Sequence, residues 1–309
     1  MHYVVREGDV SAVEGVSFAL AEGESLGLVG ESGCGKTSVA LCLLGLLPEN
    51  ARILGGHIWL GDVDLASLSE EGIRPFRWKQ IAMVFQAAMN ALNPVYRVGD
   101  QIAEALHEHL APMTRDQARN RVAELFVLVG IDPAMAARYP HEFSGGMRQR
   151  AIIAMALSCN PTLIVADEPT TALDVIVQDR VLSKLKAIQH ELHMGMIYIS
   201  HDMAVIAEVS DRVGVMYAGH LVELAAAVEI FQRPLHPYTE ALMGAFPSIR
   251  GPRRELVTLP GEPPDLLHPP SGCRFHPRCA SADETCRHQA PPWQAHGDGH
   301  LAACWHPRR

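Results

Sequence analysis

Eight residues near the start of the chain have the types and spacing of a loop that binds phosphate groups. Residues 30–37, Gly-Glu-Ser-Gly-Cys-Gly-Lys-Thr, satisfy G-x-x-x-x-G-K-[ST] at every fixed position. The glycines let backbone N–H groups approach phosphate oxygens, and a helix N-terminus adds about half a positive charge. We expect Lys36 to reach the β- and γ-phosphates and Thr37 to hold Mg²⁺. An ordinary glycine-rich turn would not need Lys-Thr after its last glycine, so the sequence predicts a nucleoside triphosphate site.

The segments on both sides of this loop are those that such a loop needs. Residues 25–29 form a short apolar run typical of a strand, and residues 36–47 are rich in Leu, Ala and Val, which favours a helix. Strand, loop and helix therefore follow one another in the required order. The residues of the loop predicted to bind the nucleotide are Gly30, Ser32, Gly33, Cys34, Gly35, Lys36, Thr37 and Ser38.

Two carboxylates follow a second apolar strand, where ligands of open α/β sheets bind. Residues 163–166 form this strand, and Asp167 and Glu168 come directly after it. We expect Asp167 to hold Mg²⁺, directly or through water, and Glu168 to polarise the attacking water as the catalytic base. A solvated acidic turn is the alternative, and the phosphate loop disfavours it. His201 follows the next strand, where it can contact the γ-phosphate.

The composition indicates a folded protein whose main partner is not a nucleic acid. The chain has 309 residues, a formal net charge of −9 and a pI near 6.0, which disfavour a nucleic-acid-binding surface. No run approaches the ~18 apolar residues that a membrane helix needs. The N-terminal residues do not have the pattern of a secretory signal. We therefore expect a cytosolic protein whose seven cysteines form no disulfides.

The order of apolar and amphipathic segments predicts a doubly wound α/β core. Near-continuous apolar strands separated by amphipathic helices are typical of a parallel sheet covered on both faces. Residues 90–160 have a helical pattern, which indicates an insertion, and strong periodicity is lost beyond residue 233. The predicted segments are strands over 79–85, 163–166 and 196–200 and helices over 98–109, 115–129 and 175–192.

The C-terminal part of the chain contains four of the seven cysteines. They are spaced C-x5-C-x6-C-x17-C, and four thiolates suit either a Cys₄ zinc site or an iron–sulfur cluster. The absence of a C-x2-C pair weakens the zinc interpretation, whereas His276 and His306 keep it open. Four unliganded cysteines in a loose extension are the remaining alternative. The predicted ligands are Cys273, Cys279, Cys286 and Cys304.

Residues 142–150, Glu-Phe-Ser-Gly-Gly-Met-Arg-Gln-Arg, resemble the signature motif of ABC-transporter ATPases. The Ser-Gly-Gly of this motif at a helix start is a further anion site. The resemblance implies that it closes on ATP held by the phosphate loop of a second subunit, so that two half-sites make one active site. The residues implied to contact that ATP are Ser144, Gly145 and Gly146.

Three further positions acquire a role through the same resemblance. Gln86 matches the glutamine of the Q-loop, with a catalytic and Mg²⁺-binding role, and Asp174 matches the D-loop. Tyr3 is similar to the aromatic residue that stacks on adenine. In the family that residue follows a first β-strand, whereas only two residues precede Tyr3 here. We therefore expect either a chain that begins late or a missing first strand.

More narrowly, the chain resembles the oligopeptide/dipeptide branch of ABC importers over essentially its whole length. Cys34 departs from this branch, which more often has Ser there, and so do residues 87–88, Ala-Ala, which replace a more polar pair. The branch is known for a [4Fe–4S] cluster on a similar cysteine-rich tail. The segments that resemble it are residues 30–33, 92–94, 143–150, 166–174 and 236–239.

The resemblance implies a P-loop NTPase fold of ABC type. We expect a mostly parallel sheet with an antiparallel N-terminal β part, an inserted helical subdomain and a Cys-rich C-terminal extension with a four-Cys metal site. The implied domains are an ATPase core of residues 1–86 and 161–232, a helical signature subdomain of residues 87–160 and an extension of residues 233–309.

The implied function is ATP hydrolysis that powers import of di- and oligopeptides. The implied cofactors are ATP, Mg²⁺ and a [4Fe–4S] cluster, with zinc as the alternative. The implied partners are a related second ATPase in a heterodimer, two membrane-spanning permease subunits and, indirectly, an extracytoplasmic solute-binding protein. The chain would lie peripherally on the cytoplasmic face of the inner membrane.

Three alternatives to peptide import stay open. Nickel or another small solute is possible within the same branch. A soluble ABC ATPase acting on DNA or ribosomes would usually have a long coiled-coil insertion or two fused nucleotide domains, which this sequence lacks. A regulatory nucleotide-binding module is disfavoured by the intact Glu168 and His201.

Overall fold

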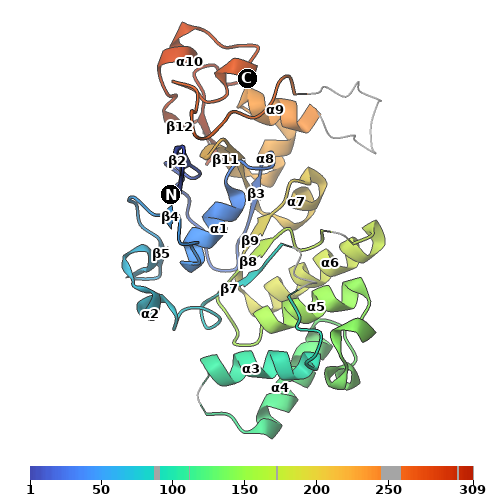
Figure 1. Ribbon diagram of the computed structural model, residues 1–309. Coiled ribbons are helices and arrows are strands. Elements are labelled where there is room, and N and C mark those ends of the chain that lie inside the picture. The colour runs from blue at the N-terminus through green and yellow to red at the C-terminus, as the bar shows by residue number, and fades with distance from the viewer. Residues whose placement is uncertain (87–90, 111, 172, 245–258, 298, 309) are drawn as a thin grey trace. The chain divides into compact units, whose positions relative to one another are not determined.

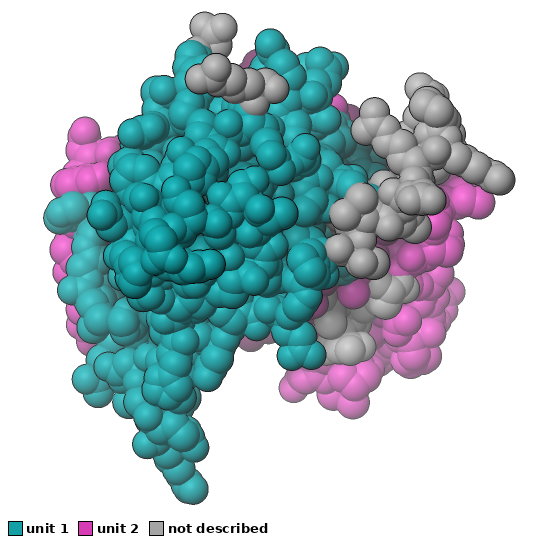
Figure 2. Space-filling view, turned by 90° about the horizontal axis from the view of Figure 1, so that it is seen from above, with its two compact units in different colours: residues 1–19, 26–58, 199–309 teal, residues 20–25, 59–198 magenta. Residues whose placement is uncertain are grey.

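The computed structural model forms two compact units of strands and helices. Unit 1 comprises residues 1–19, 26–58 and 199–309, and unit 2 comprises residues 20–25 and 59–198 (Figure 2). No helix in the described part of the chain is long and apolar enough to cross a membrane. The structure describes residues 1–86, 91–110, 112–171, 173–244, 259–297 and 299–308 (Figure 1).

Unit 1 contains five neighbouring strands of a mixed sheet, in the order β12-β13-β11-β10-β3. All five residues of β3 are buried, and β3 pairs in parallel with β10, as a near-continuous apolar strand requires. β10 turns back antiparallel into β11 at Ala218 and Gly219, which both have positive φ, as in a type I′ hairpin. The strands are β3 (Ser25–Val29), β10 (Arg212–Tyr217), β11 (His220–Ala226), β12 (Trp293–Ala295) and β13 (Leu301–Ala303).

The described residues of unit 1 also form a separate antiparallel sheet with the order β2-β1-β4 and five α-helices. Helix α1 ends at Leu44, three residues before the predicted end, because Gly45 adopts the left-handed conformation and caps it. The strands are β1 (His2–Val5), β2 (Gly8–Ser11) and β4 (Ala51–Arg52), and the helices are α1 (Lys36–Leu44), α7 (Met203–Val209), α8 (Ala227–Gln232), α9 (Pro237–Gly244) and α10 (Glu284–His288).

Unit 2 combines parallel strands with the longest helices of the described chain. Strands β7 (Ile81–Val84) and β8 (Leu163–Asp167) pair in parallel, and β9 (Gly195–Ile199) contributes residues 195–198 to this unit. A short hairpin, β5 and β6, precedes them. The remaining elements are β5 (Trp59–Leu60), β6 (Val63–Asp64), α2 (Glu70–Ile73), α3 (Val98–His109), α4 (Arg115–Leu128), α5 (Gly145–Ala156) and α6 (Val175–Leu192).

The mixed α/β architecture predicted from the sequence is confirmed. Helices α3 and α6 occupy the predicted residues, and α4 begins at Arg115 in a capping box made by Thr114 and Gln117. Its apolar stripe faces inward, since Val122, Leu125 and Phe126 are buried. Residues 87–88, which depart from the oligopeptide branch, lie outside the described residues.

The C-terminal extension takes part in the sheet of unit 1. Strand β13 pairs antiparallel with β11, placing Leu301 beside Leu224 and Ala302 beside Glu223. The sequence did not reveal this strand, because three residues are too few to show an alternation. Contacts therefore group the extension with the phosphate loop in one compact unit, while the predicted domain boundaries stay a prediction.

Candidate functional site

The predicted phosphate loop joins β3 to α1 and lies tightly against neighbouring backbone. Gly30 and Gly35 have φ of 151° and 104°. A Cβ at Gly30 would lie 2.1 Å from the Met216 carbonyl oxygen, and one at Gly35 would lie 2.2 Å from that of Ala12. A side chain at either position would therefore displace the loop, which explains why glycine stands there.

Lys36 and the start of α1 give the loop the properties of an anion site. The Lys36 side chain is buried, and its Nζ donates hydrogen bonds to the carbonyl oxygens of Gly30 (2.8 Å) and Glu31 (3.0 Å). Helix α1 has Gly35 as its N-cap and no side-chain cap, so its first-turn N–H groups need an acceptor from outside. Phosphate oxygens are such acceptors, and the loop therefore fits a nucleotide.

The other loop residues differ in exposure. Ser32, Gly33 and Thr37 are exposed, as contacts to a ligand and to Mg²⁺ require. Cys34 is buried with its Sγ 3.6 Å from Lys36 Nζ, and burial raises the pKa of this thiol. Cys34 therefore contributes to the site as a neutral side chain, and its backbone N–H donates to the Glu31 carbonyl oxygen at 3.3 Å.

Tyr3 lies on β1 in unit 1, opposite Val10 on β2. Its hydroxyl is 3.1 Å from the hydroxyl of Ser38, the residue that directly follows the loop motif. The structure thus brings the predicted adenine-stacking residue to the end of the phosphate loop. Its contact with adenine stays a prediction.

Gln86 and Glu168 meet in unit 2 at the end of β8. Glu168 Oε2 accepts hydrogen bonds from Gln86 Nε2 at 2.8 Å and from Thr171 Oγ1 at 2.9 Å. Asp167, the last residue of β8, is buried, whereas Glu168 is half-buried. The sequence motifs did not state this pairing, which fixes the orientation of the predicted catalytic carboxylate.

Glu168 also has an unusual backbone conformation. Its φ of 46° lies in the left-handed region, which costs a non-glycine residue about 1–2 kcal/mol. Such conformations persist mainly where the surrounding structure imposes them, often at functional sites. The turn at Glu168 directs the chain from β8 toward Thr171 while its carboxylate stays beside Gln86.

The signature motif and Asp174 lie at the starts of two packed helices of unit 2. Ser144 is the N-cap of α5 and accepts a hydrogen bond from Met147 N, and Gly145 is the first residue of that helix. Asp174 is the N-cap of α6 and accepts one from Val177 N. A Cβ at Gly146 would lie 2.4 Å from Val177 Cγ1, so glycine permits the close contact between the helices. Capping and packing account for these contacts, and the roles of the residues toward ATP stay predictions.

His201 follows β9 in unit 1 and is exposed. The next residue, Asp202, caps α7 by accepting hydrogen bonds from Ala204 N and Val205 N. This cap fixes the turn that bears the histidine. The described contacts place His201 in the same unit as the phosphate loop, and its contact with a γ-phosphate stays a prediction.

One of the four tail cysteines belongs to a close group of possible metal ligands. Among the described residues, the one group of three possible metal ligands within 4.8 Å of one another is Asp283, Cys286 and His306. Three of the four predicted cysteine ligands contribute no atom to it. Burial raises the pKa of Cys273 and Cys304 to about 11, which favours neutral thiols at these two positions.

Comparison with known families identifies the chain. Residues 13–171 match the family model described as ABC transporter. The chain belongs to the ABC transporter family. Residues 222–286 of this ABC protein also match the model described as the C-terminal region of oligopeptide/dipeptide transporters. The resemblance found from the sequence motifs is confirmed.

Curated relatives match the ABC protein over nearly its full length. It is 46% identical to the dipeptide transport ATP-binding protein DppD of Bacillus subtilis over 96% of this chain and 90% of the relative. It is 44% identical to the oligopeptide transport ATP-binding protein OppD of Salmonella typhimurium over 99% of this chain and 91% of that relative. Among solved structures, the dimeric ABC transporter cassette MJ0796 has a TM-score of 0.65 at 25% identity, over 73% of this chain and 95% of that cassette. These matches confirm the ABC ATPase fold.

The prediction of a [4Fe–4S] cluster in the tail is wrong. The relatives are described as peptide transport ATP-binding proteins, and neither they nor the two family models indicate an iron–sulfur protein. The cysteine spacing showed only that four thiols were available, and four available thiols do not establish that a cluster is bound. The zinc alternative on the same four cysteines has no support either.

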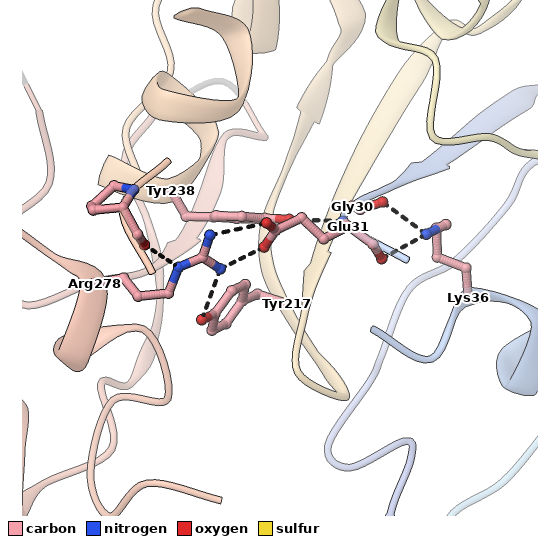
Figure 3. A network of polar contacts seen from close by, with 7 residues as sticks. Gly30, Glu31, Lys36, Tyr217, Tyr238 and Arg278 are labelled. Carbon is pink, nitrogen blue, oxygen red and sulfur yellow. Dashed lines mark hydrogen bonds and ion pairs between the residues drawn. The ribbon is translucent and has the colours of Figure 1, made fainter. Parts of the chain in front are cut away.

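Sequence reasoning missed a polar network that reaches the phosphate loop from the C-terminal part of unit 1 (Figure 3). Arg278 forms an ion pair with Glu31, and Tyr238 accepts a hydrogen bond from Glu31 N. The sequence showed both the motif at residues 236–239 and the acidic residue after Gly30. It did not indicate that these parts of the chain are in contact, because the partners are more than 200 positions apart.

Proposed function

We propose that the chain is the ATP-hydrolysing subunit of an importer for di- and oligopeptides. The observation that supports this most is the phosphate loop, whose glycines, Lys36 and uncapped α1 form an anion cradle in a chain with relatives named for peptide transport. The cassette MJ0796, similar in fold, has been solved as a dimer bound to ADP and phosphate.

Different residues of the chain bind the phosphates, the adenine and the Mg²⁺ of ATP. The backbone N–H groups of the loop and Lys36 bind the phosphates, and Tyr3 contacts the adenine. Thr37, Gln86 and Asp167 hold Mg²⁺, which when bound neutralises charge on the phosphoryl oxygens. Lys36 adds its positive charge at the position where negative charge develops on the phosphoryl group.

Glu168 orients and deprotonates the attacking water. Its carboxylate is held by hydrogen bonds from Gln86 and Thr171 to Oε2, which fix its orientation for this role. His201 contacts the γ-phosphate. Because Gln86 bonds directly to Glu168, a displacement of Gln86 would change the geometry of the catalytic base.

A second ATPase completes the site. In this proposal Ser144, Gly145, Gly146 and Asp174 lie across a dimer interface and contact the ATP bound to the partner's phosphate loop. The partner is a related but distinct ATPase, and the pair lies on the cytoplasmic face of the inner membrane. It binds two permease subunits, which receive peptides from an extracytoplasmic solute-binding protein.

The domain organisation is part of the same proposal. Residues 1–86 and 161–232 form the ATPase core, residues 87–160 form the helical signature subdomain that transmits closure to the permeases, and residues 233–309 form the extension. The supporting observations are the helices α3, α4 and α5 and the match of residues 222–286 to the C-terminal region of oligopeptide/dipeptide transporters.

Glu168→Gln tests the catalytic assignment. In the complex purified through a tag on this chain, we expect ATP affinity within about threefold of wild type and turnover lowered at least a hundredfold at this site, because a general base typically contributes about 10²–10⁴-fold. Glu191→Gln, an exposed change at the end of α6, is the matched control and should leave turnover unchanged. Hydrolysis undiminished by Glu168→Gln contradicts the assignment.

Uptake by cells tests the solute. Cells that lack this chain should lose uptake of labelled di- and tripeptides and regain it with the wild-type gene but not with Glu168→Gln. Unchanged peptide uptake together with lost nickel uptake contradicts the peptide assignment.

A further inference from the structure

Glu31, the residue directly after the first glycine of the phosphate loop, is held from three sides. Its carboxylate pairs with Arg278, its backbone N–H donates to Tyr238 Oη at 2.9 Å, and its carbonyl oxygen accepts from Lys36 Nζ. Figure 3 shows these contacts converging on Glu31 within unit 1. Arg278 and Tyr238 both belong to the part of the chain beyond residue 233.

The Arg278 contact is a bidentate ion pair in a nearly buried position. Arg278 Nη1 and Nη2 donate to the two carboxylate oxygens of Glu31 at 2.6 and 2.9 Å. The same guanidinium donates to the Pro260 carbonyl oxygen at 2.7 Å and to Tyr217 Oη at 3.3 Å. Only 5% of the Arg278 side chain and 23% of the Glu31 side chain are exposed. The pairing with Glu31 raises the pKa of Arg278, and such a fork fixes both position and orientation of the carboxylate.

Tyr238 is itself fixed by packing. It is fully buried at the start of α9, with ring centroids 4.6 Å from Tyr217 and 5.3 Å from Phe275. Tyr238 N donates to His236 Nδ1 at 3.0 Å. The hydroxyl that receives the Glu31 N–H therefore has a defined position, and the residues of the 236–239 motif acquire a structural role.

The charge of Glu31 gives these contacts a consequence for ligand binding. A carboxylate in a loop that receives phosphate groups repels them unless a cation neutralises it. Lys36 contacts the backbone carbonyl of Glu31, whereas the guanidinium of Arg278 contacts the carboxylate. Arg278 thus holds the start of the loop in place and cancels its unfavourable charge.

We infer that Arg278 and Tyr238 are positioning residues of the phosphate loop, through which the C-terminal extension sets the affinity of the chain for the triphosphate of ATP. The inference rests on the proposed function, since it needs ATP as the ligand of the loop. Arg278 and Tyr238 contact Glu31, and in this inference they affect ATP binding through Glu31 and not by contact with the nucleotide.

A cavity beside the loop agrees with this arrangement. It is lined by residues 31–34 of the loop, by Tyr217 and Ala218, and by Pro263, Pro264 and Leu266 of the extension. The extension therefore borders the loop along several residues, and the ion pair is the charged contact within this border.

A double-mutant cycle in the full-length chain tests the inference, with the dissociation constant for Mg·ATP measured by calorimetry. We expect Arg278→Gln to weaken binding about tenfold, equivalent to about 1.4 kcal/mol, because it leaves Glu31 charged and unpaired. Glu31→Gln should weaken it less, about threefold or below. The double variant should bind more tightly than Arg278→Gln alone, since the repelling charge is gone. Tyr238→Phe, which removes one hydrogen bond and keeps the ring, should have an effect of about threefold.

Three further measurements separate positioning from general stability. Arg274→Gln removes the same charge from an ion pair of the extension with Glu14 and should leave ATP affinity within twofold of wild type. The defect of Arg278→Gln should shrink in high salt, because screening weakens the repulsion by Glu31. Arg278→Lys should retain part of the affinity that Arg278→Gln loses, since it keeps the charge without the bidentate geometry.

The outcomes distinguish the inference from the function on which it rests. A wild-type chain that does not bind Mg·ATP overturns the proposed function and the inference together. A wild-type chain that binds ATP, with Arg278→Gln binding equally well, overturns the inference alone. Equal loss in Arg274→Gln and Arg278→Gln also overturns it, because the effect then comes from the extension as a whole.

Discussion

The phosphate loop and the C-terminal extension hold their conformations by opposite means. The loop depends on backbone geometry, since Gly30 and Gly35 place their Cα atoms where a Cβ would collide with neighbouring carbonyl oxygens. The extension depends on side chains, because Phe275 packs against Tyr217, Tyr238 and His236. Glu31 belongs to the phosphate loop and is held in place by side chains of the extension. We therefore expect that substitutions which add side-chain atoms destabilise the loop, and that substitutions which remove side-chain atoms destabilise the extension.

Truncation of the aromatic cluster should have the largest effect on stability. Phe275 is 3% exposed and its ring lies 5.2 Å from that of Tyr217 and 5.3 Å from that of Tyr238. Phe275→Ala should lower the free energy of unfolding by about 3–5 kcal/mol, as for other buried phenylalanines. Urea unfolding measures it, with the exposed Trp293→Ala as control. A loss below about 1 kcal/mol contradicts the view that side-chain packing holds the extension.

Two glycines of the loop provide a matched test of whether added side-chain atoms destabilise it. Gly35→Ala should cost about 2–3 kcal/mol, since it adds a Cβ 2.2 Å from Ala12 O at a φ of 104°. Gly33→Ala meets no atom within 4 Å and should cost only the strain of a φ of 80°, about 1–2 kcal/mol. Thermal unfolding measures both. Equal losses would show that backbone contact does not shape the loop.

Acid should destabilise the chain through His236 in the extension. Burial lowers the pKa of His236 from 6.5 to about 3, so below pH 6.5 the unfolded chain binds a proton that the folded chain does not. The contribution of neutral His236 to the free energy of unfolding is fully present above pH 6.5 and is lost as the pH drops toward 3. Over this range the free energy of unfolding should fall by up to about 1.4 kcal/mol per pH unit.

His236→Asn is the matched variant, because an amide oxygen can accept the Tyr238 N–H without titrating. Urea unfolding at several values between pH 6.5 and 4 should show a shallower dependence in this variant than in wild type. Parallel pH profiles would contradict a neutral buried His236.

The smallest effect belongs to an ion pair at the surface of the extension. Arg308 Nε donates to Glu240 Oε2 at 2.7 Å, but both side chains are about half exposed. Arg308→Gln should change stability by less than about 1 kcal/mol and leave ATP affinity unchanged. Differential scanning calorimetry and ATP titration check this. If Arg308→Gln lowered the free energy of unfolding as much as Phe275→Ala, surface ion pairs and not buried aromatic packing would stabilise the extension.

Local signals explain what the sequence could predict. The loop at residues 30–37 was recognisable because its chemistry requires glycines and Lys-Thr at fixed spacing, and α3 and α6 because their apolar residues recur with the helical period. The end of α1 was predicted three residues late, since the capping conformation of Gly45 competes with a run of apolar residues.

Long-range contacts explain what the sequence could not predict. The Arg278 and Glu31 pair depends on how β10, α9 and the extension pack, and neither residue has a distinctive spacing. The bond from Gln86 to Glu168 likewise joins positions 82 residues apart. The cysteines of the tail have a distinctive spacing that led to a wrong prediction, because spacing alone does not establish that four thiols hold a cluster.

Amide hydrogen exchange of the loop tests most directly whether the extension holds it. Glu31 N–H donates to Tyr238 Oη, and the Arg278 fork fixes the same residue. In the nucleotide-free, full-length chain, Arg278→Gln should speed exchange in residues 31–35 several-fold while the middle of α1 exchanges as in wild type, and Arg274→Gln should leave both unchanged. Exchange in residues 31–35 at the wild-type rate in Arg278→Gln would contradict the account.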